Sequence, residues 1–143
     1  MQQTAILEPV AALALLTALV WIRLYVERIG EMRERGIHPQ SIASSAARNE
    51  RLQRTSGADN FKNLLELPVL FYALCLSLLA SGAVTQGFLL AAWAYVALRA
   101  LHSLIHLTYN RVMHRFLVYV ASSVLLFGAW IVFALGLAGR GVG

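Results

Sequence analysis

The chain has 143 residues, of which 59% are hydrophobic and 13% are charged, and its formal net charge is +5. A soluble domain is roughly 45–50% apolar and about 25% charged, so a water-soluble core cannot hold this apolar excess and much of it must face lipid. The composition excludes a disordered chain, and the lone Cys75 excludes an intramolecular disulfide scaffold. A nucleic-acid module is also excluded, because the basic residues lie between apolar blocks, where they set membrane topology.

Four apolar blocks are long enough to cross a bilayer as helices, which takes about 20 residues each. They cover residues 6–26, 61–79, 87–107 and 116–137. The connections from Ser81 to Gly87 and from Tyr109 to Arg115 are short, so they force antiparallel hairpins. We therefore expect a single domain over residues 1–143, an all-α integral membrane bundle of four antiparallel helices.

The connection between the first two blocks, residues 27–60, is long and polar. Its first part predicts a continuation of the first helix, with Glu27, Glu31, Arg28 and Arg35 on a water-facing side. After Gly36 the sequence indicates a polar loop that folds partly into helix on a membrane surface.

Basic residues are unevenly distributed among the connections and therefore predict an orientation. Ten lie in or beside the first and third connections, namely Arg23, Arg28, Arg33, Arg35, Arg48, Arg51, Arg54, Lys62, Arg111 and Arg115. The second connection has none, and the C-terminal tail has Arg140. Because cytoplasmic loops carry the excess of Lys and Arg, we expect these two connections in the cytoplasm and both termini outside.

Polar residues inside the apolar blocks are the candidate site. An ionisable group at the centre of a membrane helix costs roughly 2.5–3.5 kcal/mol and usually faces the bundle interior. Asn63 and Glu66 share one face of the second helix at i, i+3 spacing. Either Glu66 pairs with Lys62, or the acid and amide bind a polar ligand or arginines of another helix.

A second polar stripe lies on the third helix, where Arg99, His102 and His106 fall at i, i+3 and i+7. In the structural interpretation Arg99 forms an ion pair with Glu66 across the bundle. In the functional interpretation, the three residues line a site for a small polar ligand. The two histidines also have a spacing seen in metal sites, but no third ligand accompanies them, so no metal is expected.

Arg111 and Arg115 lie at the turn into the fourth helix, with Tyr119 nearby. Positive-inside anchoring alone explains arginines here. At similar depth to the other polar residues, however, they suit a small ligand with several carboxylates and an amine. Arginine binds carboxylates through forked, charge-assisted hydrogen bonds, Glu66 suits the amine, and an arginine beside a thiol favours the thiolate.

These residues resemble the family of membrane-associated proteins in eicosanoid and glutathione metabolism (MAPEG). The family signature is an Asn-x-x-Glu pair at the start of the second helix, followed by a proline and aromatics. Here it is Asn63-Leu-Leu-Glu66-Leu-Pro68-Val-Leu-Phe71-Tyr72. Arg99, His102, His106, Arg111, Arg115 and Tyr119 match the spacing of the Arg, His, Tyr, Arg, Arg and Tyr of the prostaglandin E synthase branch.

The resemblance implies a homotrimer of four-helix bundles, with glutathione as co-substrate bound between neighbouring subunits near the cytoplasmic face. Arg115 would stabilise the thiolate, and a small apolar electrophile would enter from the membrane lipid. The implied glutathione-binding residues are Arg28, Asn63, Glu66, His102, His106, Arg111 and Tyr119. Arg23 is the alternative to Arg28 on the first helix.

The sequence also departs from that branch, since His106 replaces its Tyr, and Asp59, Asn60 and Phe61 stand where catalytic members have Arg or Gln. The resemblance is closest to bacterial members, which implies a bacterial inner membrane.

A glutathione transferase or peroxidase is the first interpretation. A non-enzymatic membrane binding or assembly protein of the same fold is the alternative. A small multidrug transporter is disfavoured, because it needs an acid deep in a helix with little arginine beside it.

Overall fold

A computed structural model describes residues 2–140, apart from the side chain of Arg140. Its α-helices are α1 Leu7–Glu34, α2 Ser45–Arg51, α3 Ser56–Leu65, α4 Pro68–Ala80, α5 Gln86–Leu107 and α6 Val112–Arg140. Short 3-10 helices, η1 Gln3–Ile6 and η2 Pro39–Ile42, precede α1 and α2. The part of the chain described is thus helical, with turns and loops between the helices.

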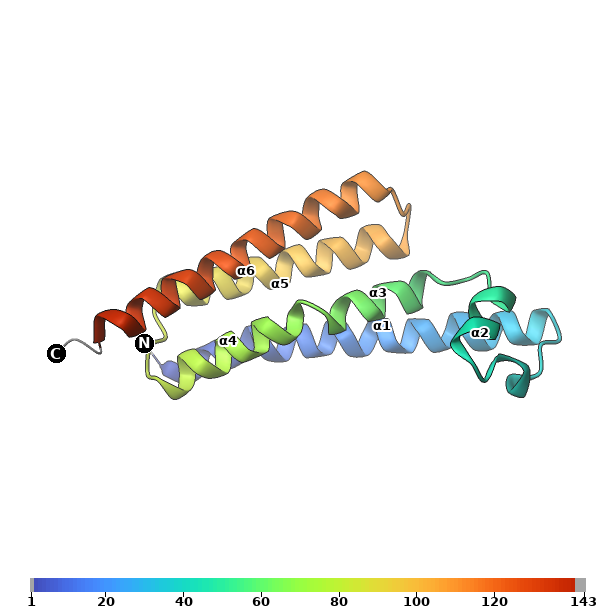
Figure 1. Ribbon diagram of the computed structural model, residues 1–143, viewed down its shortest axis with the longest axis horizontal. Helices are drawn as coiled ribbons and strands as arrows, with labels where there is room; N and C mark the ends of the chain where they lie inside the picture. Colours follow the sequence, from blue (N-terminus) through green and yellow to red (C-terminus); the bar gives the residue numbers. More distant parts are fainter. Residues whose placement is uncertain (1, 141–143) are drawn as a thin grey trace.

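The helices form two antiparallel pairs that lie side by side (Figure 1). α3 and α4 run back along α1, and α5 and α6 form the second pair. The start of α1, the α4–α5 connection and the end of α6 lie at one end of the bundle. The α1–α3 and α5–α6 connections lie at the other, which we call the charged end (residues 27–62 and 108–115).

Four helical segments are long and apolar enough to cross a membrane, which confirms the predicted fold class. They are Gln3–Glu34, Ser56–Ala80, Gln86–Leu107 and Val112–Gly139. Large side chains such as Leu15, Val124 and Leu135 are more than half exposed on the outside of the bundle. An apolar surface of this kind is stable in lipid and not in water, so the chain is a multi-pass integral membrane protein.

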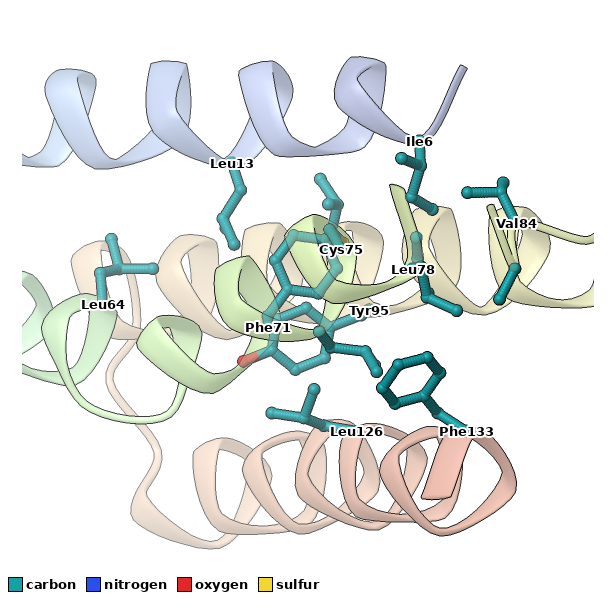
Figure 2. Packing of buried hydrophobic residues seen from close by; sticks show 14 of the residues in the cluster. Ile6, Leu13, Leu64, Phe71, Cys75, Leu78, Val84, Tyr95, Leu126 and Phe133 are labelled. Atoms are coloured by element: carbon teal, nitrogen blue, oxygen red, sulfur yellow. The ribbon is translucent and has the colours of Figure 1, made fainter. Parts of the chain in front are cut away.

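The apolar core joins all four spans and extends from Ile6 and Val84, at the end opposite the charged end, to Leu64 of α3 (Figure 2). Phe71 of α4 and Tyr95 of α5 stack with ring centroids 4.7 Å apart. Leu13 of α1 and Leu126 of α6 close the core from the two sides. Cys75 is buried here and behaves as a small hydrophobic side chain.

The connection from α1 to α3 is bound tightly to α1 by a buried carboxylate. Glu31 is 2% exposed and accepts hydrogen bonds from the backbone amides of Gln53 (2.8 Å) and Arg54 (2.9 Å) and from Nη1 of Arg35 (2.8 Å). The prediction that Glu31 faces water is therefore wrong. Amides from more than twenty residues away cover this side of α1, and their hydrogen bonds offset the loss of hydration.

A second glutamate of α1 fixes the start of α3. Oε2 of Glu27 accepts a hydrogen bond from the amide of Gly57 at 2.8 Å, one of the amides that the first turn of a helix leaves without a partner. A Cβ atom on Gly57 would lie 2.7 Å from that oxygen and 2.8 Å from Cα of Leu24. Only glycine therefore lets the two helices approach this closely.

The Gly57→Ala substitution should destabilise the protein by at least about 1–3 kcal/mol, the usual cost of overpacking, because neither backbone can move without separating α1 from α3. The measurement is thermal unfolding of the detergent-solubilised protein, followed by tryptophan fluorescence.

Gly30→Ala is the matched control on α1. A Cβ atom there would meet nothing nearer than 3.9 Å, and replacing a mid-helix glycine by alanine gains about 0.5–1 kcal/mol. Equal melting temperatures for the two variants would contradict the close-approach explanation.

Candidate functional site

A cavity of about 220 Å³ lies next to the charged end, between α3, α5 and α6. Its lining consists of Asn63, His102, Val112, Arg115, Phe116 and Tyr119. Four of these six, all but Val112 and Phe116, are residues that the sequence predicts for the site. The structure thus brings residues from three helices around one space.

Arg115 is held in this cavity by two hydrogen bonds that its Nη1 donates. Its Nη1 lies 2.7 Å from Nε2 of His106 and 2.7 Å from Oδ1 of Asn110. A guanidinium has five N–H donors and no acceptor, so both contacts are donated by Arg115. Within the described part of the chain, Nε and Nη2 of Arg115 have no acceptor, and those donors are free for a ligand.

The imidazole of His102 is oriented by the backbone of α6. Nδ1 lies 3.2 Å from the carbonyl oxygen of Arg115, and because a carbonyl can only accept, Nδ1 carries the proton. In the neutral ring Nε2 is then an acceptor. Nε2 is buried and has no partner among the described residues, while the ring lies 6.0 Å from that of Tyr119.

Arg99 is fully buried beside the cavity and covers a break in the second span. Its Nη2 donates to the carbonyl oxygen of Asn63 at 2.7 Å. In a continuous helix that carbonyl would accept from the amide of residue 67, but α3 ends at Leu65. Pro68 begins α4 and has no N–H, so it favours the break. Arg99 therefore satisfies a carbonyl at the C-terminus of α3, where a cation is favourable.

The predicted ion pair of Arg99 with Glu66 does not form within this chain. In the described region, no carboxylate lies within 4.0 Å of Arg99, and Glu66 acts on it only at longer range. Glu66 is exposed and does not pair with Lys62 either.

Comparisons with known proteins identify the family. Residues 6–135 match the model of the MAPEG family, which covers nearly the whole chain. The chain belongs to the MAPEG family. No curated protein and no solved structure matches it.

Four predicted glutathione-binding residues of this MAPEG protein do not line the cavity. His106 contacts Arg115 without being part of the lining, and the other three are Glu66, Arg111 and Arg28. Glu66 follows the last residue of α3, and Arg111 is exposed just before α6. Arg28 lines a separate cavity of about 490 Å³ between α1, α2 and α3, together with Arg48 and Lys62. One chain therefore does not bring all the predicted residues together.

Asn110 contacts the candidate residue Arg115 and was not predicted from the sequence. Its φ of 49° is left-handed, which Asn tolerates better than most residues, and its amide donates to the carbonyl of Ile105 at 2.8 Å. Asn110 lies three residues after Leu107, the last residue of α5, and an Asn shortly after a helical segment is a usual signal for such a helix end. That signal points to the backbone conformation, but not to the bond with Arg115.

A buried pair one turn before Asn63 ties α3 to α5. Oγ of Ser103 donates to Oδ1 of Asn60 at 3.2 Å, and Asn60 is fully buried. Ser103→Ala should cost about 1–3 kcal/mol of unfolding free energy, because the Asn60 oxygen would lose its partner inside the bundle. Chemical denaturation in mixed micelles measures this.

The matched variant is Ser77→Ala on α4, a half-buried serine for which the described structure shows no side-chain hydrogen bond. If removing either hydroxyl changed stability equally, the Asn60–Ser103 bond would have no special role.

Proposed function

We propose that the protein binds glutathione in the Arg115 cavity and acts as a glutathione transferase or peroxidase on apolar electrophiles. Members of the MAPEG family commonly use glutathione. The observation that supports the proposal is that the Arg115 guanidinium lies at a cavity with hydrogen-bond donors still available. That guanidinium lines the 220 Å³ cavity, and two of its nitrogens have no acceptor in the described chain.

Arg115 would supply the chemistry by stabilising a thiolate. A guanidinium beside a thiol lowers the pKa of the thiol and raises the fraction of the nucleophilic form. In a transfer reaction the thiolate sulfur bonds to the electrophilic carbon, and the leaving group departs with its electron pair. With a hydroperoxide, the sulfur attacks oxygen and the O–O bond breaks. The departing alkoxide takes up a proton and becomes an alcohol. The glutathione sulfenic acid then condenses with the thiol of a second glutathione, which gives glutathione disulfide and water.

The lipid side of the cavity fits an apolar second substrate. Val112 and Phe116 line the cavity and are 70% and 58% exposed on the outside of the bundle. A membrane-dissolved electrophile would therefore reach the sulfur without crossing water. We expect small apolar electrophiles to react and polar ones to react poorly.

A neighbouring subunit would complete the glutathione site in a homotrimer. Arg28 lies with Arg48 and Lys62 in the 490 Å³ cavity between α1, α2 and α3, whereas the Arg115 cavity lies between α3, α5 and α6. Contact between these two faces would add the arginines of one subunit to Asn63 and Arg115 of the next. Glu66 and Arg111 are exposed and would bind the ligand amine and a carboxylate.

The orientation follows the charge distribution. The charged end holds most of the basic residues, so it would face the cytoplasm, where glutathione is available, and both termini would lie outside. We place the protein in a bacterial inner membrane.

A non-enzymatic membrane binding or assembly protein of the same fold is the second candidate. It is favoured by the contacts of Arg115 with His106 and Asn110, which also join the ends of α5 and α6. In that case the polar residues serve packing alone.

Glutathione binding and the ultraviolet absorbance of its thiolate separate the two candidates. The wild type should bind saturably with a thiolate signal. Arg115→Ala should abolish that signal and weaken binding roughly 10- to 100-fold, the equivalent of a charge-assisted hydrogen bond of about 1.5–3 kcal/mol. Glu66→Gln should weaken binding and retain the thiolate signal.

Arg51→Ala is the control, because this arginine is exposed on α2 and its side chain makes no described contact. It removes the same charge from the charged end without touching the cavity. A folded wild type that binds no glutathione at millimolar concentration would overturn the transferase proposal and leave the assembly protein.

A further inference from the structure

Two side chains hold the Arg115 guanidinium from the α5 side of the cavity. His106 lies in the last turn of α5 and is 2% exposed, and its Nε2 is 2.7 Å from Nη1 of Arg115. Oδ1 of Asn110, in the connection to α6, is 2.7 Å from the same nitrogen. Neither contact uses Nε or Nη2, so the two residues fix one edge of the guanidinium and leave the other for a ligand.

The hydrogen-bond geometry determines the protonation state of His106. Because Arg115 can only donate, Nε2 of His106 must be free of a proton, and the neutral ring then carries its proton on Nδ1. Nδ1 is buried and has no partner in the described chain. A doubly protonated ring would direct an N–H at the N–H of Arg115, and the contact would be lost.

The charges around His106 are few, and Arg115 is the nearest. His102, on the same helix, has its ring centroid 6.0 Å away. Asp59 on α3 and Glu27 on α1 act on His106 electrostatically, but in the described chain neither carboxylate forms an ion pair with it. On acidification the imidazolium of His106 would therefore be repelled by the Arg115 guanidinium, and no carboxylate among the described residues is in contact to hold the imidazolium in place.

We propose that His106 and Asn110 are positioning residues for Arg115, and that protonation of His106 releases the guanidinium and makes thiolate stabilisation sensitive to pH. The inference rests on the proposed glutathione function and deepens it. The direction of the pH effect follows from this geometry. While His106 is neutral it holds the Arg115 guanidinium in place, and protonation of His106 at lower pH removes that contact. Tyr, which the prostaglandin synthase branch has at this position, would not titrate near neutral pH.

Two substitutions of His106 separate positioning from simple packing. In His106→Gln the amide oxygen takes the place of Nε2 as an acceptor that does not titrate. In His106→Phe the ring volume remains and the acceptor is lost. Asn110→Gly keeps the left-handed backbone available and removes the other acceptor.

The first readout needs no ligand. Nitrogen-15 NMR of the histidine-labelled and arginine-labelled protein in micelles, with His106→Gln for assignment, reports protonation directly. At neutral pH Nε2 of His106 should be unprotonated, and the Arg115 resonance should shift together with the titration of His106. The inference would be overturned by a protonated Nε2 at neutral pH, or by an Arg115 chemical shift that does not change as His106 titrates. Either result counts whether or not the protein binds glutathione.

The second readout is the thiolate absorbance of bound glutathione across pH. The wild type should lose its signal more steeply on acidification than a single protonation allows, because the sulfur and His106 both take up protons. His106→Gln should keep the signal at neutral pH and follow a one-proton curve. His106→Phe and Asn110→Gly should lower the thiolate fraction at neutral pH.

The outcomes keep the two proposals distinct. Superimposable pH curves for the wild type and His106→Gln, or a wild-type signal in His106→Phe, would refute the positioning role while glutathione binding stands. Absence of glutathione binding in every variant would refute the proposed function, and the NMR titration would still decide whether His106 positions Arg115.

Discussion

Every backbone polar group inside a bilayer must find a partner within the protein, and the break at Pro68 is where this constraint shapes the molecule. The break leaves the carbonyl of Asn63 without its helical amide, and Arg99 donates to it. An arginine at membrane depth is costly unless it is partnered, so each of the two groups stabilises the other. This contact joins α3 to α5 at the depth where Asn63 and His102 line the cavity.

The glutamates of α1 apply the same principle at the charged end. Glu27 and Glu31 accept hydrogen bonds from backbone amides that no helix or sheet satisfies, and Glu34 pairs with Arg54 through two bonds of 2.7 and 3.1 Å. They fix where α3 begins, and the register of α3 in turn decides which face carries Asn60 and Asn63. The site therefore depends on a connection that lies outside it.

Much of the fold could be predicted from the sequence, because lipid imposes a simple length and composition rule on each span. The periodicity of His102 and Arg99 also placed them on one helix face, and the position of Arg115 at similar depth made it a candidate. The family resemblance then suggested specific roles for Arg115 and Tyr119. The sequence could not reveal the partner of Arg99, which lies 36 residues away. Nor could it reveal the burial of Glu31, because that depends on amides supplied by a distant segment and not on local pattern.

The contact between Asn110 and Arg115 could not be predicted from the sequence either, because it also depends on how distant groups meet in the fold. A residue type predicts a backbone conformation, but which side chain it meets is decided by how two helices leave the turn. His106 illustrates the opposite case. Its position on the polar stripe was predicted, whereas its chemical role as acceptor became visible only with the 2.7 Å distance to Arg115.

The central claim is that the polar residues beside the charged end form a ligand site around Arg115 and are not packing alone. The most direct test is an experimental structure of the protein in lipid nanodiscs with saturating glutathione. We predict three chains, with glutathione between neighbours and its sulfur at the unoccupied edge of the Arg115 guanidinium. An empty cavity at saturating glutathione, or a sulfur bound away from Arg115, would contradict it.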